Sequence, residues 1–234
     1  MKAIFGKKIG MTQIFSDSGE IIPVTVVSAG PCVVTQVKTA KKEGYNAIQL
    51  GFDATEEKEL IKPLAGHCKK AGTAFFKKFF ELRIDKPEEY KPGQEIKCDI
   101  FVPGEYVDVS GITKGHGFQG VVKRHGFAGG PMTHGQSDKQ RAPGSVGAQQ
   151  PQRVIKGTRM AGRMGGVNAT VQKLEIVKVM PQENVILVKG AVPGVKNGLI
   201  MISQTVKKRK FKVVEKPVAA KETKKGTAKK EVKK

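Results

Sequence analysis

The side chains with the clearest chemical role lie between residues 111 and 166, where nine cations accompany a single acid, Asp138. Arg binds phosphates through two parallel hydrogen bonds and Lys acts as a point charge. The segment also holds half of the chain's 28 glycines, which let a backbone approach a phosphate chain closely. Together they predict a polyanionic partner. The nine cations are Lys114, Lys123, Arg124, Lys139, Arg141, Arg153, Lys156, Arg159 and Arg163.

Neighbouring polar residues favour RNA as that partner. Gln149 and Gln150 offer amides that bind base edges or ribose 2′-hydroxyls. Aromatic residues are scarce in the segment, with only Phe118 and Phe127, so base stacking is secondary to tracking the backbone. This composition favours a compact, folded RNA.

Glycines 115, 117 and 120 match the G-x-G-x-x-G pattern of dinucleotide-binding loops, which requires a following helix. Gly126, Gly129, Gly130 and Pro131 argue against such a helix. No Gly-Lys-Ser/Thr phosphate loop is present. The sequence therefore predicts no nucleotide cofactor.

Three histidines, His116, His125 and His134, recur every nine residues in the same segment. They lack the spacing of a metal site, so we expect them to donate hydrogen bonds to phosphates. No G-x-S-x-G elbow and no carboxylate pair occurs there, so no catalytic residue and no small-molecule substrate are predicted. Two alternatives stay open: an enzyme acting on RNA with these histidines as acid–base groups, and a soluble assembly chaperone.

Charge is distributed unevenly along the 234 residues, whose net charge is +21. The segment at 111–166 and a Lys-rich tail at 207–234, expected to be disordered, carry nearly all of it. No apolar run reaches membrane-spanning length and no leader peptide is evident, so neither a membrane partner nor export is expected. The cysteines are odd in number and far apart: Cys32, Cys68 and Cys98. We therefore expect them to be structural thiols, in a protein of the reducing cytoplasm.

Most remaining segments read as short strands, which predicts a mainly β barrel or sandwich body. We assign this body to residues 1–52, 96–110 and 167–206, interrupted by the extended loop at 111–166. Its expected strands are 3–5, 11–15, 21–28, 32–38, 47–52, 96–102, 106–112, 170–180, 185–189 and 199–204.

Residues 53–95 are predicted to form a small α+β insertion, with a helix at 60–70 that ends near Gly72. Four phenylalanines at 75, 76, 79 and 80 either pack inside, which we favour, or form a stacking platform for bases. Near the amino terminus, Lys7 and Lys8 stand between glycines and are candidates for phosphate contact, with a solvated turn as the alternative.

Several motifs in one order resemble the bacterial ribosomal protein L3 family over residues 1 to about 206. The longest is DVSGITKGHGFQGVVKR at 108–124. The others are GKKIGMTQ at 6–13, RAPGS at 141–145, RMAG at 159–162 and KGAVPG at 189–194.

The resemblance implies a six-stranded, translation-type Greek-key β-barrel with an α+β insertion, in a structural protein that is not an enzyme. It implies direct binding to large-subunit rRNA near its 3′ end, early in subunit assembly, with the long loop extending toward the peptidyl transferase centre. Expected neighbours are the ribosomal proteins L14 and L19. Some members carry an N5-methylglutamine in the loop, made by a glutamine methyltransferase, and Gln150 is the nearest match.

Overall fold

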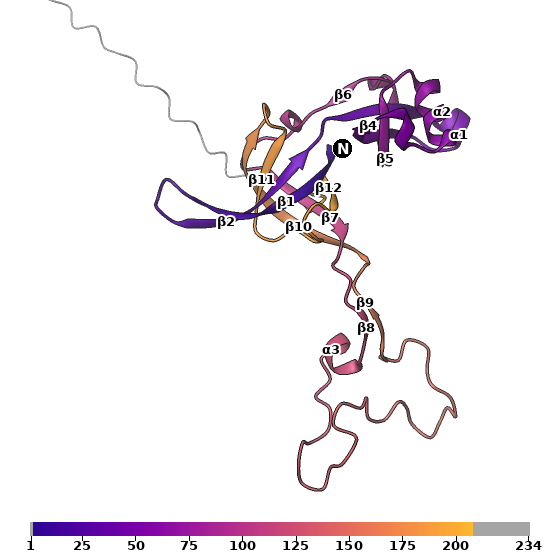
Figure 1. Ribbon diagram of the computed structural model, residues 1–234, viewed down its shortest axis with the longest axis vertical. Coiled ribbons are helices and arrows are strands. Elements are labelled where there is room, and N and C mark those ends of the chain that lie inside the picture. Colours follow the sequence, from indigo (N-terminus) through magenta and orange to yellow (C-terminus); the bar gives the residue numbers. More distant parts are fainter. Residues whose placement is uncertain (1, 208–234) are drawn as a thin grey trace, which may run out of the picture.

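The computed structural model describes residues 2–207, and its main body is a closed antiparallel barrel (Figure 1). Six strands close it in the order β1, β12, β7, β10, β11, β2. Their bounds are β1 Ala3–Phe15, β2 Ile21–Ala29, β7 Tyr106–Ile112, β10 Asn168–Met180, β11 Val185–Lys189 and β12 Leu199–Gln204. The prediction of a mainly β, six-stranded barrel is confirmed.

Alternation along the strands fills the barrel, because successive side chains of a strand point to opposite faces. Val107 and Val109 of β7, with Ile200 and Ile202 of β12, are almost fully buried in one cluster. Their small, β-branched side chains suit a pleated surface that packs on one face. The barrel is therefore a filled core and not a channel.

A second, four-stranded sheet packs beside the barrel in the order β5, β4, β3, β6. Its strands are β3 Cys32–Lys38, β4 Ala47–Thr55, β5 Phe75–Arg83 and β6 Glu95–Ile96. Helices α1 (Ala40–Glu43) and α2 (Lys62–Ala71) belong to it, with 3-10 turns η1 (Glu57–Glu59) and η2 (Pro87–Glu89). The insertion is therefore larger than the predicted 53–95, and from here on the name means residues 32–96. Phe5 of the barrel stacks on Phe80 of this sheet with ring centroids 3.9 Å apart, so the two bodies share one core.

Five of the predicted strands differ from the structure. Residues 32–38 and 47–52 were placed in the barrel, but β3 and β4 pair with β5 and β6, because the chain turns out of the barrel at Gly30, where φ is +79°. The strand expected at 96–102 is mostly the 3-10 turn η3 (Cys98–Ile100), which still buries Cys98 and Phe101. The runs 3–5 and 11–15 are one continuous strand, because Gly6 and Gly10, which lie between them, are themselves paired in the sheet.

Other expectations of this region are confirmed. The helix expected at 60–70 is α2, which ends at Gly72 in the left-handed conformation. Phe76 is buried and Phe80 packs on the core, as the packing interpretation required. All three cysteines are buried and unpaired, and burial raises the pKa of the Cys32 thiol to about 11.

The predicted tail, apart from Lys207, lies outside the described residues. Within residues 2–207, no helix is long and apolar enough to cross a membrane.

Close packing between β4 and β5 gives a first prediction. A Cβ at Gly51 would overlap the ring of Phe76, so Gly51→Ala is expected to lower the free energy of unfolding by about 1–3 kcal/mol. Urea denaturation measures it. Gly66→Ala in α2 is the control, because its Cβ meets no atom within 4 Å and removing a helical glycine adds about 0.5–1 kcal/mol. An unchanged midpoint for Gly51→Ala would contradict this packing.

Candidate nucleic-acid interface

The cationic segment leaves the barrel as an arm between two paired strands. β7 and β10 run antiparallel with Ile112 opposite Asn168 and Ser110 opposite Thr170. The pairing continues past the strand ends, because the amide of Thr113 donates to the carbonyl of Val167 at 2.9 Å. Figure 1 shows the arm extending from this end of the barrel, far from α1 and α2. We call residues 113–166 the arm.

A short ladder stiffens the part of the arm next to the barrel. β8 (Gly117–Gln119) pairs with β9 (Gly162–Met164), and the amide of His116 donates to the carbonyl of Met164 at 2.9 Å. Gly165 joins this ladder to the root with φ of +73°, and a Cβ there would overlap the carbonyl oxygen of Lys114. Only glycine fits that close approach of the two chains.

A five-residue helix, α3 (Val121–His125), follows β8, at a place where the sequence argued against the helix of a dinucleotide-binding loop. Gly126, with φ of +73°, ends it after little more than one turn, so it is too short for the crossover helix of a dinucleotide fold. The glycines that argued against a long helix therefore act as its stop signal.

Two side chains of α3 tie the outgoing chain to the returning one. The guanidinium of Arg124 donates to the carbonyl oxygen of Met160 at 2.6 Å, and Nε2 of His125 lies 3.0 Å from the same oxygen. Both side chains are half-buried. Arg124 and His125 thus hold the arm's two strands together beyond the β8–β9 ladder.

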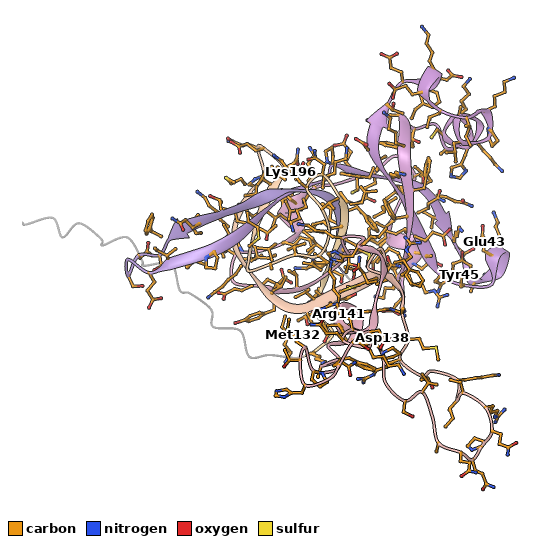
Figure 2. All side chains as sticks on the ribbon, turned by 60° about the horizontal axis from the view of Figure 1, so that its bottom comes forward. Glu43, Tyr45, Met132, Asp138, Arg141 and Lys196 are labelled. Carbon is orange, nitrogen blue, oxygen red and sulfur yellow. The ribbon has the colours of Figure 1, made fainter. Side chains whose placement is uncertain are left out.

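Beyond this tie the arm has no core of its own. None of residues 126–166 is buried, and most hydrogen bonds there are local, such as that from the hydroxyl of Thr158 to the carbonyl of Ile155 at 2.7 Å. One longer contact, from the amide of Gly130 to the carbonyl of Gln140 at 2.8 Å, closes the loop between these two residues. The distal arm therefore offers its polar groups outward (Figure 2).

Eight of the nine cations, all except Arg124, have exposed side chains. Within residues 2–207 none of the nine forms an ion pair with an acid, whereas eight lysines outside the arm do. Figure 2 shows Arg141 on the arm, well separated from Glu43 of the insertion. The structure thus brings together unneutralised positive charge along a single extension.

Lys7 and Lys8 are occupied by partners within the protein. Lys7 forms an ion pair with Asp53 at 2.7 Å. The ammonium of Lys8 donates to the carbonyl of Val192 at 2.8 Å, and its pKa is lowered by burial and then by the charge of Lys114. Lys8 and Lys114 are therefore close enough at the root of the arm for their charges to repel each other. A phosphate contact by either lysine stays a prediction.

The remaining predicted contacts are exposed and do not converge. His116, His134, Gln149 and Gln150 all face outward from the arm. Within residues 2–207 no three His, Cys, Asp or Glu side chains gather as metal ligands would. These four residues are placed for an external surface, and their contacts stay predictions.

Sequence reasoning missed the apolar side chains that the arm leaves in solvent. Phe118 and Met132 are each 78% exposed, and Ile155 is 61% exposed. In a segment without hydrophobic periodicity, the sequence gives no sign of whether an isolated apolar side chain is buried or exposed. The structure is needed to show that these three are exposed. An open cavity of about 510 Å³ in the distal arm is lined by Phe127, Gln136 and Lys139, among others.

Comparisons with known proteins agree with these features. The family model described as "Ribosomal protein L3" matches residues 84–183. Large ribosomal subunit protein uL3 of Heliobacterium modesticaldum is 53% identical over 206 residues, which cover 88% of this chain and 98% of that protein. The same-named proteins of Pelotomaculum thermopropionicum and Chlorobaculum parvum are 55% and 56% identical, over 89% and 88% of this chain and 99% and 100% of theirs.

Proposed function

Since the chain belongs to the ribosomal protein L3 family and is a structural protein of the large ribosomal subunit, we propose that it binds large-subunit rRNA directly through the arm. Its place is the cytoplasmic ribosome, and the family is one of structural proteins rather than enzymes. The observation that carries the proposal is a set of eight exposed cations, on an extension without a core, that form no ion pair with any acid of residues 2–207.

The arm can bind in a way that the barrel cannot. Next to the barrel the arm is two paired chains, β8 and β9, and beyond them it opens into wide loops (Figure 1). Such an open extension can pass between RNA helices, where phosphates on either side meet its cations. Phe118 and Met132 would be buried away from water in such a groove, and this burial contributes favourably to the free energy of binding. The β8–β9 ladder and the Arg124–Met160 tie reduce the ordering entropy that binding would otherwise cost.

The finer elements of the proposal follow the family. The arm extends toward the peptidyl transferase centre, binding takes place early in subunit assembly, and L14 and L19 are neighbours of the barrel. Gln150 is proposed as the N5-methylation site, and its exposed amide is accessible to a methyltransferase. His116, His125 and His134, with Lys139 and the other arm cations, are assigned to the rRNA contact.

Salt dependence tests the proposal. If the eight free cations each neutralise one phosphate, the logarithm of affinity for a large-subunit rRNA fragment should fall with the logarithm of salt with a slope of about −6 to −7. Filter binding or fluorescence anisotropy across a salt series measures that slope. A slope near zero would mean that phosphate neutralisation is not the mechanism.

A further inference from the structure

The β1–β2 hairpin continues beyond the barrel as a free ribbon. β12 pairs with β1 only as far as Lys7, and β11 pairs with β2 only from Val24 inward. Beyond Lys7, residues 10–15 of β1 pair within the described chain only with β2, where Gln13 lies opposite Pro23 and Phe15 opposite Ile21. The last tie of this end of β2 to the barrel is the carbonyl of Pro23, which accepts from the amide of Gly190 at 2.9 Å. Figure 1 shows the ribbon projecting away from both the arm and the insertion. We call residues 10–23 the hairpin tip.

The two faces of the hairpin tip differ in their surroundings. Ile14 and Ile22 lie opposite each other and pack with Val24, Val185 and Leu187 on the outside of the barrel. The other face carries Phe15 directly opposite Ile21, with Met11 on the same side. These three side chains are 68%, 58% and 54% exposed. Gln13 lies between Met11 and Phe15 on this face, and exposed Pro23 lies opposite it. Several large apolar side chains exposed together in this way mark an interaction surface.

The charge of this region favours a cationic partner over RNA. Residues 9–37 contain no Lys or Arg, in a chain that has 42 of them. The only charged side chains in that stretch are Asp17 and Glu20, both exposed in the turn, and neither has an ion-pair partner among residues 2–207. Phosphates would be repelled by these carboxylates, whereas a cationic peptide would be attracted.

The tip is also preorganised for docking. In its turn, the amide of Gly19 donates to the carbonyl of Ser16 at 2.9 Å, and the amide of Glu20 donates to the hydroxyl of Ser16 at 3.0 Å. Within the described chain, the outer edge of β1 from Gly10 to Phe15 has no partner strand. A fixed turn lowers the entropy cost of binding, and a free strand edge offers main-chain hydrogen bonds.

We propose that the hairpin tip docks a basic segment of a neighbouring protein in the large subunit. An apolar side chain of that segment packs against Phe15 and Ile21, and its Lys or Arg side chains meet Asp17 and Glu20. The proposal rests on the proposed function, because subunit membership supplies the protein neighbour. It gives the molecule two binding sides, an arm for RNA and a hairpin for protein.

Photocrosslinking in assembled large subunits tests the proposal. The photoreactive residue p-benzoylphenylalanine replaces Phe15, or Ile21 in a second variant, in the full chain expressed in its own organism. Both positions are exposed, so folding should be unaffected. After irradiation of purified large subunits, mass spectrometry should identify a crosslink to another ribosomal protein, in a segment with net positive charge. The same probe at exposed Ile61 of the insertion is the positional control.

Charge reversal adds a second readout. Asp17→Lys with Glu20→Lys should lower the crosslink yield about tenfold or more, because two attractive contacts become repulsive. Glu56→Lys with Asp85→Lys makes the same charge change on exposed residues of the insertion and should leave the yield unchanged.

A crosslink to rRNA, to the chain itself, to a second copy or to no partner would overturn the proposal while leaving the proposed function intact. Absence of the chain from large subunits would instead overturn the proposed function, and the docking proposal with it.

Discussion

Neutralising six cations of the arm is expected to lower the affinity of the protein for large-subunit rRNA by about three to five orders of magnitude at about 0.1 M salt. The loss is large because each side chain is exposed and, within residues 2–207, none is paired with an acid, so each can release counterions from one phosphate. Gel-shift titration with an rRNA fragment measures it. The variant replaces Lys139, Arg141, Arg153, Lys156, Arg159 and Arg163 with Gln.

A matched variant separates the position of the charge from its amount. It replaces six exposed lysines of the insertion, Lys41, Lys42, Lys58, Lys62, Lys70 and Lys78, with Gln. Net charge falls equally in both variants, but the insertion lies away from the arm (Figure 1). We expect this variant to lose less than about tenfold in affinity. Similar losses in the two variants would mean that the protein binds RNA by net charge alone.

Gly165→Ala is expected to weaken rRNA binding by about two orders of magnitude at about 0.1 M salt, equivalent to about three phosphate contacts. A Cβ at this position would overlap the carbonyl oxygen of Lys114, so the two chains at the base of the arm must separate. The positive φ of Gly165 adds strain for any other residue. The arm would then leave the barrel in another direction, with its charge unchanged. Gel-shift titration reports the loss.

Gly115→Ala provides the control for this substitution. Gly115 is next to Lys114, but a Cβ there meets no atom within 4 Å and its φ is not in the left-handed range. We expect its rRNA affinity to match that of the unmodified protein. Urea denaturation of Gly165→Ala should show a barrel of normal stability, because the barrel core does not include the arm. Normal affinity of Gly165→Ala would show that the base of the arm does not set its direction.

The barrel could be predicted from the sequence because the alternation of buried and exposed side chains is a local property of each strand. The spacing of Val107 and Val109 predicts one buried face of β7, and that of Ile200 and Ile202 predicts one for β12. Sheet membership is not local, so β3 and β4 could not be assigned to the second sheet from their residues. Their hydrophobic pattern is the same in either sheet, and the turn at Gly30 decides between them.

The candidate interface was predictable as a region but not in its contacts. Composition identified the cations of the arm, since a glycine-rich segment without apolar periodicity cannot bury a core of its own. Side-chain partners depend on residues far along the chain, which no spacing reveals. Lys7 pairs with Asp53, Lys8 with the carbonyl of Val192, and Arg124 with the carbonyl of Met160.

The salt dependence of rRNA affinity, measured side by side for the unmodified protein and the two six-glutamine variants, tests the role of the arm most directly. We expect the arm variant to reduce the magnitude of the log–log slope by about 4 to 5 and the insertion variant to change it by less than about 1. Equal slopes for all three proteins, or an equal reduction in both variants, would contradict phosphate neutralisation by the arm.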